Sequence, residues 1–217
     1  MARGARPKHG PKQGKDRRQE ILNAAAIVIT QRGLADTRIQ DIAERCDVSP
    51  GLILYYFDSK DRLLVEALTY ANDQFYLRLS RELRRIGTAR EQLERVIELS
   101  VPGLLPEFDL FDEWALWIEI WVRALRDPAM ATEREALDRR WRQSISDIVR
   151  SGRETGEFPE GEDADDLGRA ISAMIDGLAV QVLMRDPVMT PKTMQRLCLE
   201  ISGRLIGFAV EPAAATV

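Results

Sequence analysis

Apolar side chains recur along most of the chain at intervals of three or four residues, which is the spacing of an α-helix. Ile21, Ala25, Val28 and Ile29 form the first such stripe, and strand-like alternation is essentially absent. Glycines, prolines and capping residues divide the chain into about nine segments of this kind, with three short ones first and longer ones later. The pattern therefore predicts an all-α protein of about nine helices.

The starts of several helices carry specific signals. Thr37–Gln40, Thr88–Glu91 and Thr132–Glu135 each have the spacing of a capping box, in which the threonine caps the helix and the later side chain reaches back. Ser49-Pro50 and Thr190-Pro191 place a cap directly before a proline, whose missing N–H costs nothing at the first helical position. Helices are therefore expected to begin at each of these points.

Residues 37–57 contain two short helices with a very short turn between them, which is the layout of a helix-turn-helix unit. Helix 39–46 carries an apolar stripe that is expected to pack inward and to hold helix 50–57 at a fixed angle. The N-terminal residues of helix 50–57 would then enter the major groove of DNA. Helix pairs are common, so the layout alone does not decide the function.

The string from Thr37 to Leu64, TRIQDIAERCDVSPGLILYYFDSKDRLL, resembles the DNA-binding domain of the TetR family of bacterial repressors. The resemblance extends over residues 16–64, because the preceding helix with Ile21-Leu22 and its closing Gly33 also fits. The rest of the chain resembles the family in the number and length of its helices. GLILYYF looks most like the choline-responsive, BetI-type members. The matching positions are Thr37, Ile42, Ala43, Val48, Ser49, Gly51, Tyr56, Phe57, Lys60 and Leu63 or Leu64.

The resemblance implies an N-terminal three-helix DNA-binding domain and a larger helical domain for ligand binding and dimerisation. We expect a basic flexible arm over residues 1–15, the DNA-binding domain over 16–62, the larger domain over 63–211 and a flexible tail over 212–217. It also implies a homodimeric repressor that binds a palindromic double-stranded DNA operator and is released by a small-molecule effector. Ligand in the larger domain would reorient the long helix over residues 60–86.

Several residues of the helix-turn-helix unit suit contacts with DNA. Arg38 suits a base or a phosphate, Ser49 and the free N–H groups that follow it suit a phosphate, and Gly51 lets the backbone approach closely. Tyr55 and Tyr56 carry hydroxyls that can reach phosphates, although Tyr56 suits core packing equally well. The expected DNA-binding residues are Arg17, Arg18, Thr37, Arg38, Ser49, Pro50, Gly51, Leu52, Tyr55, Tyr56 and Lys60.

Two positions depart from the family's pattern. Asp47 stands where relatives usually have glycine, and the turn is expected to survive because aspartate tolerates the left-handed conformation. Leu54 stands where many relatives have a tyrosine that touches phosphate, and leucine cannot form that hydrogen bond. Tyr55 is the residue that could take over this contact.

Charge is distributed unevenly along the chain. The whole sequence has a net charge of −4, which taken alone argues against nucleic-acid binding. Residues 1–60, however, contain 11 basic and 7 acidic residues, and residues 1–18 alone have a net charge of +6. This basic segment is either a solvated tail or an arm that meets phosphate. The acidic remainder would discourage non-specific binding to DNA.

The helix over residues 110–126 is the expected wall of the effector pocket. Trp114, Trp117 and Trp121 share one face of it at i, i+3 and i+7, with Glu119 close by. Such a stripe is either helix core or an aromatic cage with a carboxylate, which would suit an organic cation; an aromatic or apolar effector also stays open. The expected effector-binding residues are Phe111, Trp114, Trp117, Glu119, Trp121, Trp141 and Met174.

The last two helices, over residues 164–185 and from residue 191, are apolar over wide faces. The family pairs these helices with their symmetry mates in a four-helix dimer interface, and the alternative is that the faces belong to the core of one chain. Ala173 and Gly177 are small enough to permit close helix approach. The expected dimer-interface residues are Ile171, Met174, Ile175, Leu178, Val182, Leu197, Ile201, Leu205 and Phe208.

Other classes of protein are disfavoured by what the sequence lacks. It contains no Gly-rich phosphate loop, HExxH, G-x-S-x-G or catalytic Cys–His pairing, so an enzyme is not expected. Cys46, Cys198 and His9 cannot supply the four ligands of a structural zinc site, and no cofactor or metal is expected. An effector-independent, architectural DNA-binding protein is the main alternative to a ligand-responsive repressor.

The sequence also bears on the compartment. The longest stretch without a charged residue, Ile21–Gln31, has 11 residues, whereas a membrane-spanning helix needs about 20. The first 18 residues are basic and rich in Gly and Pro, with no apolar h-region of a signal peptide directly behind them, so a secretory signal is not expected. Two cysteines at apolar helix positions are expected to be free thiols, which fits a reducing, cytoplasmic location.

Overall fold

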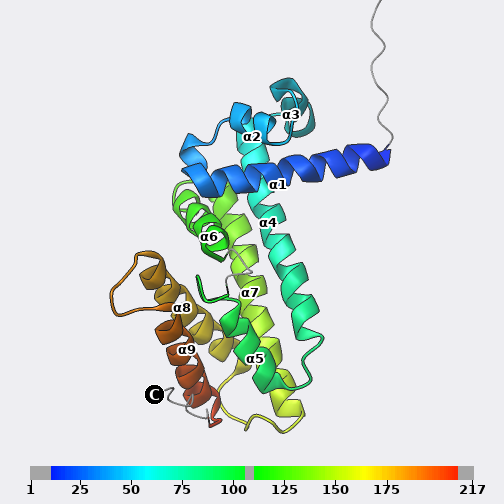
Figure 1. The fold of residues 1–217 in the computed structure, drawn as a ribbon. Helices are drawn as coiled ribbons and strands as arrows, with labels where there is room; N and C mark the ends of the chain where they lie inside the picture. Colours follow the sequence, from blue (N-terminus) through cyan, green and yellow to red (C-terminus); the bar gives the residue numbers. More distant parts are fainter. Residues whose placement is uncertain (1–10, 106–109, 210–217) are drawn as a thin grey trace, which may run out of the picture. The chain divides into compact units, whose positions relative to one another are not determined.

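The protein is described here from a computed structural model that covers residues 11–105 and 110–209. Within those residues the chain forms nine helices and no strand, which confirms the all-α prediction (Figure 1). The helices are α1 (Pro11–Asp36), α2 (Ile39–Arg45), α3 (Pro50–Phe57), α4 (Lys60–Leu83), α5 (Ala89–Glu98), α6 (Leu110–Ala124), α7 (Pro128–Glu154), α8 (Ala164–Leu183) and α9 (Pro191–Ile206).

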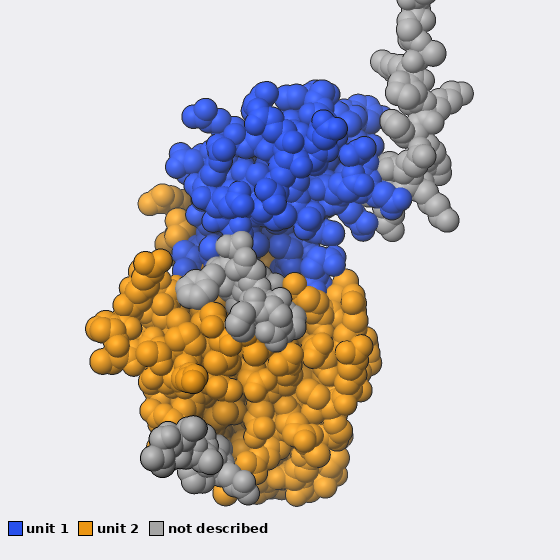
Figure 2. Space-filling view, viewed as in Figure 1, with its two compact units in different colours: residues 1–74, 115–120 blue, residues 75–114, 121–217 orange. Residues whose placement is uncertain are grey.

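The chain divides into two compact units, coloured separately in Figure 2. Unit 1 comprises Met1–Gln74 together with Ala115–Ile120, and unit 2 comprises Phe75–Trp114 together with Trp121–Val217. The boundary between the units falls inside α4, and the expected domain bounds stay a prediction. The middle of α6 belongs with unit 1, and no local sequence pattern predicts this assignment.

Unit 1 has an apolar core to which all its N-terminal helices contribute. The side chains of Ile29 from α1, Ile42 from α2, Phe57 from α3 and Leu63 from α4 are completely buried. α1 is interrupted at Gly33, where φ is 77° and ψ is 160°. Short helices such as α2 and α3 are not stable alone, so this shared core is what holds them in place.

Unit 2 is a bundle in which α7 packs against α5 and α8, and α9 packs against α5 and α8. Each helix contributes one apolar stripe to the interior, as the helical spacing of the sequence predicts. The completely buried side chains include Leu93, Ile97, Ile145, Ile171, Ile175, Met194 and Cys198.

Three of the expected helix starts are confirmed. The hydroxyls of Ser49, Thr88 and Thr190 accept hydrogen bonds from the backbone N–H groups of Leu52, Glu91 and Thr193, respectively. In each case the capping side chain satisfies an N–H that has no partner inside the helix.

Two expected helix starts are wrong. α2 is preceded by Arg38, whose backbone N–H donates to Asp41 Oδ2 at 3.2 Å, so the cap lies one residue after Thr37. α7 begins at Pro128, a full turn before Thr132. Its first turn is capped by Asp127, whose carboxylate accepts a hydrogen bond from the N–H of Met130.

The expected flexible segments fall largely outside the described residues. Residues 11–15, placed in the basic arm by sequence, are the first residues of α1. Residues 1–10 and the expected tail over 212–217 lie outside the part that the structure describes. Within the described part, no helix is both long enough and apolar enough to cross a membrane.

Candidate functional site

The helix-turn-helix unit is built around a tight turn between α2 and α3. Asp47 adopts the left-handed conformation with φ of 50°, as expected for the residue in the glycine position. The N–H of Val48 donates to the carbonyl oxygen of Ala43 at 3.0 Å, and the Cys46 thiol donates to the carbonyl oxygen of Ile42 at 3.0 Å. These bonds fix the direction in which the chain leaves α2 and enters α3.

The start of α3 leaves an open stretch of backbone. Ser49 Oγ accepts from the N–H of Leu52 at 3.2 Å, and Pro50 occupies the first helical position. The N–H of Gly51 follows at the second position, where an α-helix offers it no carbonyl partner. Gly51 is not left-handed, and a Cβ built on it would meet only Ser49 Oγ, at 4.0 Å. The fold therefore does not require glycine there, and the backbone is accessible to an anion.

The side chains of α3 separate into a buried and an exposed face. Ile53 and Phe57 are completely buried, whereas Tyr55 is 79% exposed and Leu54 is 42% exposed. Tyr56 is partly buried, and its ring meets that of Tyr55 edge-on with centroids 5.6 Å apart. The exposed face of the helix thus carries a tyrosine hydroxyl beside the accessible backbone of the helix start.

The remaining expected contact residues surround this face. Arg38 and Ser49 are exposed, and Pro50, Leu52 and Lys60 are partly buried. Gln40, which the sequence reasoning missed, is also exposed at the start of α2. The sequence feature that could have indicated Gln40 is a polar side chain two residues after Arg38.

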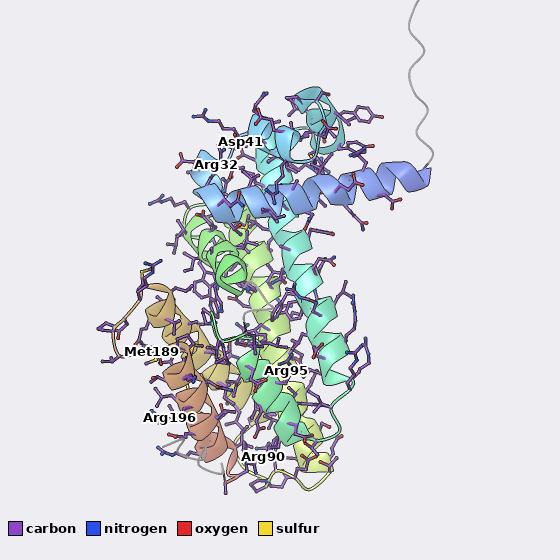
Figure 3. All side chains as sticks on the ribbon, viewed as in Figure 1. Arg32, Asp41, Arg90, Arg95, Met189 and Arg196 are labelled. Atoms are coloured by element: carbon purple, nitrogen blue, oxygen red, sulfur yellow. The ribbon has the colours of Figure 1, made fainter. Side chains whose placement is uncertain are left out.

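Thr37 is a correction to the expected DNA contacts. Its side chain is completely buried, and its Oγ1 donates to the carbonyl oxygen of Gly33 at 2.7 Å. The hydroxyl therefore stabilises the break in α1 and cannot reach DNA. An ion pair between Arg32 and Asp41, with the closest N–O distance at 2.8 Å, ties α1 to α2 beside it (Figure 3).

The two expected arginines of α1 have different surroundings. Arg17 pairs with Glu20 on the same helix at 2.7 Å, with its side chain 42% exposed. Arg18 forms an ion pair with Glu66 of α4, and its guanidinium lies 4.8 Å from the centre of the Phe57 ring. Arg18 is thus engaged by two other helices of unit 1.

Two of the three tryptophans of α6 meet directly. Trp114 is buried, and its indole N–H donates to the carbonyl oxygen of Ser100 at 2.9 Å. Its ring meets that of Trp121 edge-on with centroids 6.3 Å apart, and both belong to unit 2. Trp117 lies on the same face of the helix and is partly buried, and the aromatic cage on α6 stays a prediction.

Glu119 and Phe111 were also expected to bind the effector. A Cβ built on Gly33 would come within 3.1 Å of Glu119 Oε1, so the Glu119 carboxylate lies beside the break in α1. The side chain of Phe111 lies outside the described residues.

A second aromatic group lies between α4 and α7 of unit 2. The rings of Phe75 and Trp141 meet at a centroid distance of 6.0 Å. Tyr76 donates from its hydroxyl to the carbonyl oxygen of Leu137 at 3.2 Å, and the guanidinium of Arg140 lies 4.0 Å from the centre of its ring. Of the expected effector residues, Trp141 belongs to this group, and Met174 of α8 is partly buried.

Two carboxyl groups, those of Asp138 and Asp176, lie near Tyr76. Burial and the nearby Asp138 carboxylate raise the pKa of Asp176 to about 7, and Arg142 opposes the shift. Burial likewise raises the pKa of Asp138, although Asp138 forms an ion pair with Arg134. Asp138 precedes Trp141 by three residues and shares its helix face. This spacing could have indicated a carboxylate beside Trp141.

A cavity of about 490 Å³ opens in unit 2 between α4, α5 and α7. It contains none of the expected effector-binding residues. Arg84, Arg140 and Asp147 supply its charges. The other lining residues are Tyr76, Leu79, Ser80, Leu83, Gln92, Ser144, Ile148 and Ser151.

The expected dimer face of α8 is partly core. Ile171 and Ile175 are completely buried and Val182 is 5% exposed within the single chain, so these three residues offer no surface to a partner. Met174 and Leu178 are partly buried. The opposite side of the helix is exposed and carries Ala170, Ala173, Gly177, Gln181 and Met184.

The expected residues of α9 and its end divide similarly. Leu197 and Ile201 are partly buried, and Leu205 is 41% exposed. Phe208 stacks on Phe158 with ring centroids 5.0 Å apart, and the guanidinium of Arg90 lies 5.6 Å from its ring centre. Phe208 therefore packs within its own chain.

Family models match both parts of the molecule. The model of the bacterial regulatory proteins of the TetR family matches residues 21–67, which contain the helix-turn-helix unit. The model of the C-terminal domain of BetI-type transcriptional repressors matches residues 89–207, more than half of the chain. The chain belongs to the TetR family.

Individual TetR-family relatives agree with this assignment. The regulator BetI of Escherichia coli is 28% identical over 173 residues, which cover 77% of this chain and 84% of that protein. A transcriptional regulator of Saccharomonospora viridis, solved in complex with choline, is 34% identical with a TM-score of 0.78, covering 86% of this chain and 95% of that one. A Bacillus subtilis regulator solved with stearoyl-CoA is 23% identical with a TM-score of 0.66, covering 88% and 98%.

Membership of the TetR family settles the general function. The chain is a DNA-binding transcriptional regulator of the effector-responsive, repressor type and not an enzyme. The family's regulators bind DNA operators and small-molecule effectors and act as dimers. The resemblance found in Thr37–Leu64 and the similarity to BetI-type members are both confirmed.

Proposed function

We propose that two copies of the chain bind a palindromic operator, with the start of each α3 in a major groove and the backbone of Gly51 against a phosphate. The observation that carries this proposal is the accessible N-terminal end of α3, where Ser49 caps one N–H and the Gly51 N–H stays open. Tyr55 extends the same exposed face, and Arg38 and Gln40 flank it from α2.

The test is binding to a duplex selected from random sequences by the wild-type chain. We expect Arg38→Gln and Tyr55→Phe each to weaken binding by about tenfold, since a good DNA contact contributes about 1–3 kcal/mol. Arg169→Gln, which removes an exposed charge from α8 in unit 2, is the matched control and leaves affinity unchanged. If Arg38→Gln and Arg169→Gln weakened DNA binding equally, affinity would depend only on the total charge of the protein.

The dimer contact is proposed for the exposed side of α8 and its continuation on α9. Ala173 and Gly177 provide a small-residue surface on which a partner helix can pack closely, and Met184 is 70% exposed beside them. On α9 the exposed Leu205 and the partly buried Ile201 continue the apolar surface. A two-fold dimer places two copies of α3 on successive major grooves of the operator.

The proposed effector is a small organic cation bound beside Phe75 and Trp141. Aromatic faces attract such cations, and the Asp138 and Asp176 carboxyl groups supply negative charge near Tyr76, whose ring centroid lies 5.4 Å from that of Phe75. The choline complex of the Saccharomonospora viridis regulator, at 34% identity, supports this chemical class. Tyr76, Arg140 and Arg142 complete the polar surroundings.

Calorimetric titration with choline tests the effector proposal. We expect Trp141→Leu and Asp176→Asn each to weaken binding by about tenfold or more, whereas Trp121→Phe leaves it unchanged. Because the pKa of Asp176 is raised to about 7, choline binds more tightly at pH 8, where the carboxylate is ionised, than at pH 6. If neither Trp141→Leu nor Asp176→Asn changed the affinity for choline, the effector would bind elsewhere.

The cavity between α4, α5 and α7 is a second candidate effector site, for an anionic ligand. Its charged lining residues are Arg84, Arg140 and Asp147, so positive charge exceeds negative charge by one. Its volume lies in the usual range for ligand pockets, about 300–1,000 Å³. Octanoate and octyltrimethylammonium carry alkyl chains of similar length on head groups of opposite charge, and titration with both distinguishes the two candidates.

Variants of two neighbouring arginines test whether a bound anion lies in this cavity. Arg84 lines the cavity, and its neighbour Arg85 does not. Arg84→Gln should abolish octanoate binding while Arg85→Gln preserves it. We also propose a cytoplasmic location, because the chain belongs to a family of bacterial DNA-binding regulators and both of its cysteines are free thiols.

A further inference from the structure

Arg18 is held between two other helices of unit 1. Its guanidinium pairs with the Glu66 carboxylate of α4 and lies over the ring of Phe57, the last residue of α3, at 4.8 Å from the centroid. Phe57 is completely buried. A planar guanidinium suits both partners, since it can stack on an aromatic face and donate to a carboxylate at the same time.

Further ion pairs connect Glu66 to the end of α3. Glu66 Oε1 accepts from Arg62 Nε at 3.1 Å, and Arg62 Nη1 donates to Asp58 Oδ2 at 2.7 Å. Asp58 is left-handed, with φ of 60°, and its N–H donates to the carbonyl oxygen of Leu54 at 2.9 Å. It is the residue at which α3 ends.

The residues of these ion pairs differ in exposure. The side chains of Arg18 and Glu66 are 39% and 25% exposed, whereas those of Arg62 and Asp58 are 61% and 74% exposed. Exposed ion pairs contribute little, because water and salt screen them. Arg18 and Glu66, together with the stacked Phe57 ring, are therefore the effective part of this set of ion pairs.

The helix that these residues hold is short. α3 has eight residues, below the length of about 12–15 at which an isolated helix becomes stable. Ser49 and the turn at Asp47 fix its first end. Its second end depends on Phe57, the ring over which the Arg18 guanidinium lies. The direction of the exposed Tyr55 side chain follows from how both ends are fixed.

We propose that Arg18 is a positioning residue for operator recognition: it holds the end of α3 through Phe57 and Glu66 and does not bind a phosphate. The inference rests on operator binding through α3, and it is independent of the effector and dimer proposals. It replaces the role that the sequence predicts for Arg18, while Arg17 stays a candidate for phosphate contact.

The experiment measures the affinity for a duplex selected by the wild-type chain, over a series of salt concentrations. Arg18→Gln removes the charge, and Arg18→Lys keeps the charge but removes the planar fork. Arg169→Gln, which removes an exposed charge from α8 in unit 2, is the matched control. We expect both Arg18 variants to lose about tenfold in affinity and Arg169→Gln to lose none, with the salt dependence of Arg18→Gln unchanged.

A phosphate contact predicts a different set of results. Arg18→Gln would then lower the slope of log affinity against log salt by about 0.9, and Arg18→Lys would keep the affinity. Either result overturns the proposal. So does a loss for Arg18→Gln that disappears once the folded fraction, measured by thermal unfolding, is taken into account.

A double-mutant cycle with Glu66→Gln adds an independent readout. If Arg18 acts through Glu66, the single variants lose affinity to similar extents and the double variant loses no more than the worse of the two. If Arg18 reaches a phosphate, Glu66→Gln releases it from its carboxylate and strengthens binding, which contradicts the proposal. Selection of a duplex by the wild-type chain tests operator binding itself, and the differences among variants test Arg18.

Discussion

The Glu119 carboxylate occupies the space beside Gly33: a Cβ at position 33 would lie 3.1 Å from Glu119 Oε1. Gly33 also has φ of 77° and ψ of 160°, a conformation that is essentially restricted to glycine. We expect Gly33→Ala to destabilise unit 1 by about 2–3 kcal/mol, because the backbone strain and the steric contact add. Chemical denaturation measures this change.

Two further variants separate the contributions at Gly33. Gly87→Ala is the control, since a Cβ there meets nothing within 4 Å and the residue is not left-handed. Glu119→Ala combined with Gly33→Ala removes the steric contact alone, so the double variant should recover only part of the loss. Full recovery would mean that the backbone conformation costs nothing.

Replacing Gly51 should lower operator affinity without lowering the stability of the fold. The chain itself leaves room for a methyl group at this position, and alanine favours the helix, so Gly51→Ala should be as stable as the wild type or more stable by about 0.5 kcal/mol. Operator affinity should nevertheless fall by about fivefold or more, because the methyl group stands where the backbone meets a phosphate. Denaturation and DNA titration on the same sample measure both, and an unchanged affinity would remove Gly51 from the interface.

The helix-turn-helix unit could be predicted closely because its signals are local. Ser49-Pro50 marks the start of α3, and Asp47 takes the left-handed turn conformation by its own preference. The error at Thr37 has a tertiary cause. Its hydroxyl bonds to the Gly33 carbonyl beside the break in α1, and neither that break nor its partner can be located from the spacing of Thr37 and Gln40.

The larger domain was less predictable because its helices are apolar on more than one side. On α8 the spacing of Ile171 and Ile175 marks a buried stripe, but it does not say whether the same chain or a partner buries it. Glu119 of α6 lies beside Gly33 of α1, and the helical spacing of α6 does not predict this long-range contact. The pairing of Phe75 with Trp141 depends in the same way on how α4 and α7 meet.

Asp176 should make the protein less stable as pH rises through the acidic range. Burial and the Asp138 carboxylate raise its pKa to about 7, against about 3.9 in an unfolded chain. The folded chain therefore holds the proton more tightly, and this contribution to stability is fully present below pH about 4 and is lost as pH rises to about 7. We expect Asp176→Asn to be more stable than the wild type at pH 8 by about 1–3 kcal/mol and no more stable at pH 4.

Urea unfolding at pH 4, 6 and 8 measures the effect at Asp176. Asp165 lies on the same helix and is the control of opposite sign, because a hydrogen bond from Arg150 lowers its pKa. Asp165→Asn should therefore lose stability at neutral pH, where Asp176→Asn gains it. Parallel pH profiles for the wild type and Asp176→Asn would show that this carboxyl group is not the source of the dependence.

Two glycines on α8 offer a direct test of which side meets a partner. A Cβ on Gly177 would meet nothing within 4 Å, whereas a Cβ on Gly168 would lie 2.3 Å from Ser146 Oγ and 2.9 Å from the carbonyl oxygen of Arg142. Gly177→Leu should therefore keep the folded chain intact, and it should even favour the helix by up to about 1 kcal/mol. In a dimer that packs on this surface, however, the leucine holds the partner helices apart.

We expect Gly177→Leu to sediment as a monomer at concentrations where the wild type is a dimer, with unchanged helical content by circular dichroism. Operator affinity should fall with it, because a single reading head loses the contacts of the second half-site. Gly168→Ala is the matched control on the inner side: it should lower the unfolding temperature because α7 and α8 are forced apart. A dimeric Gly177→Leu variant with full operator affinity would place the interface on another surface of unit 2.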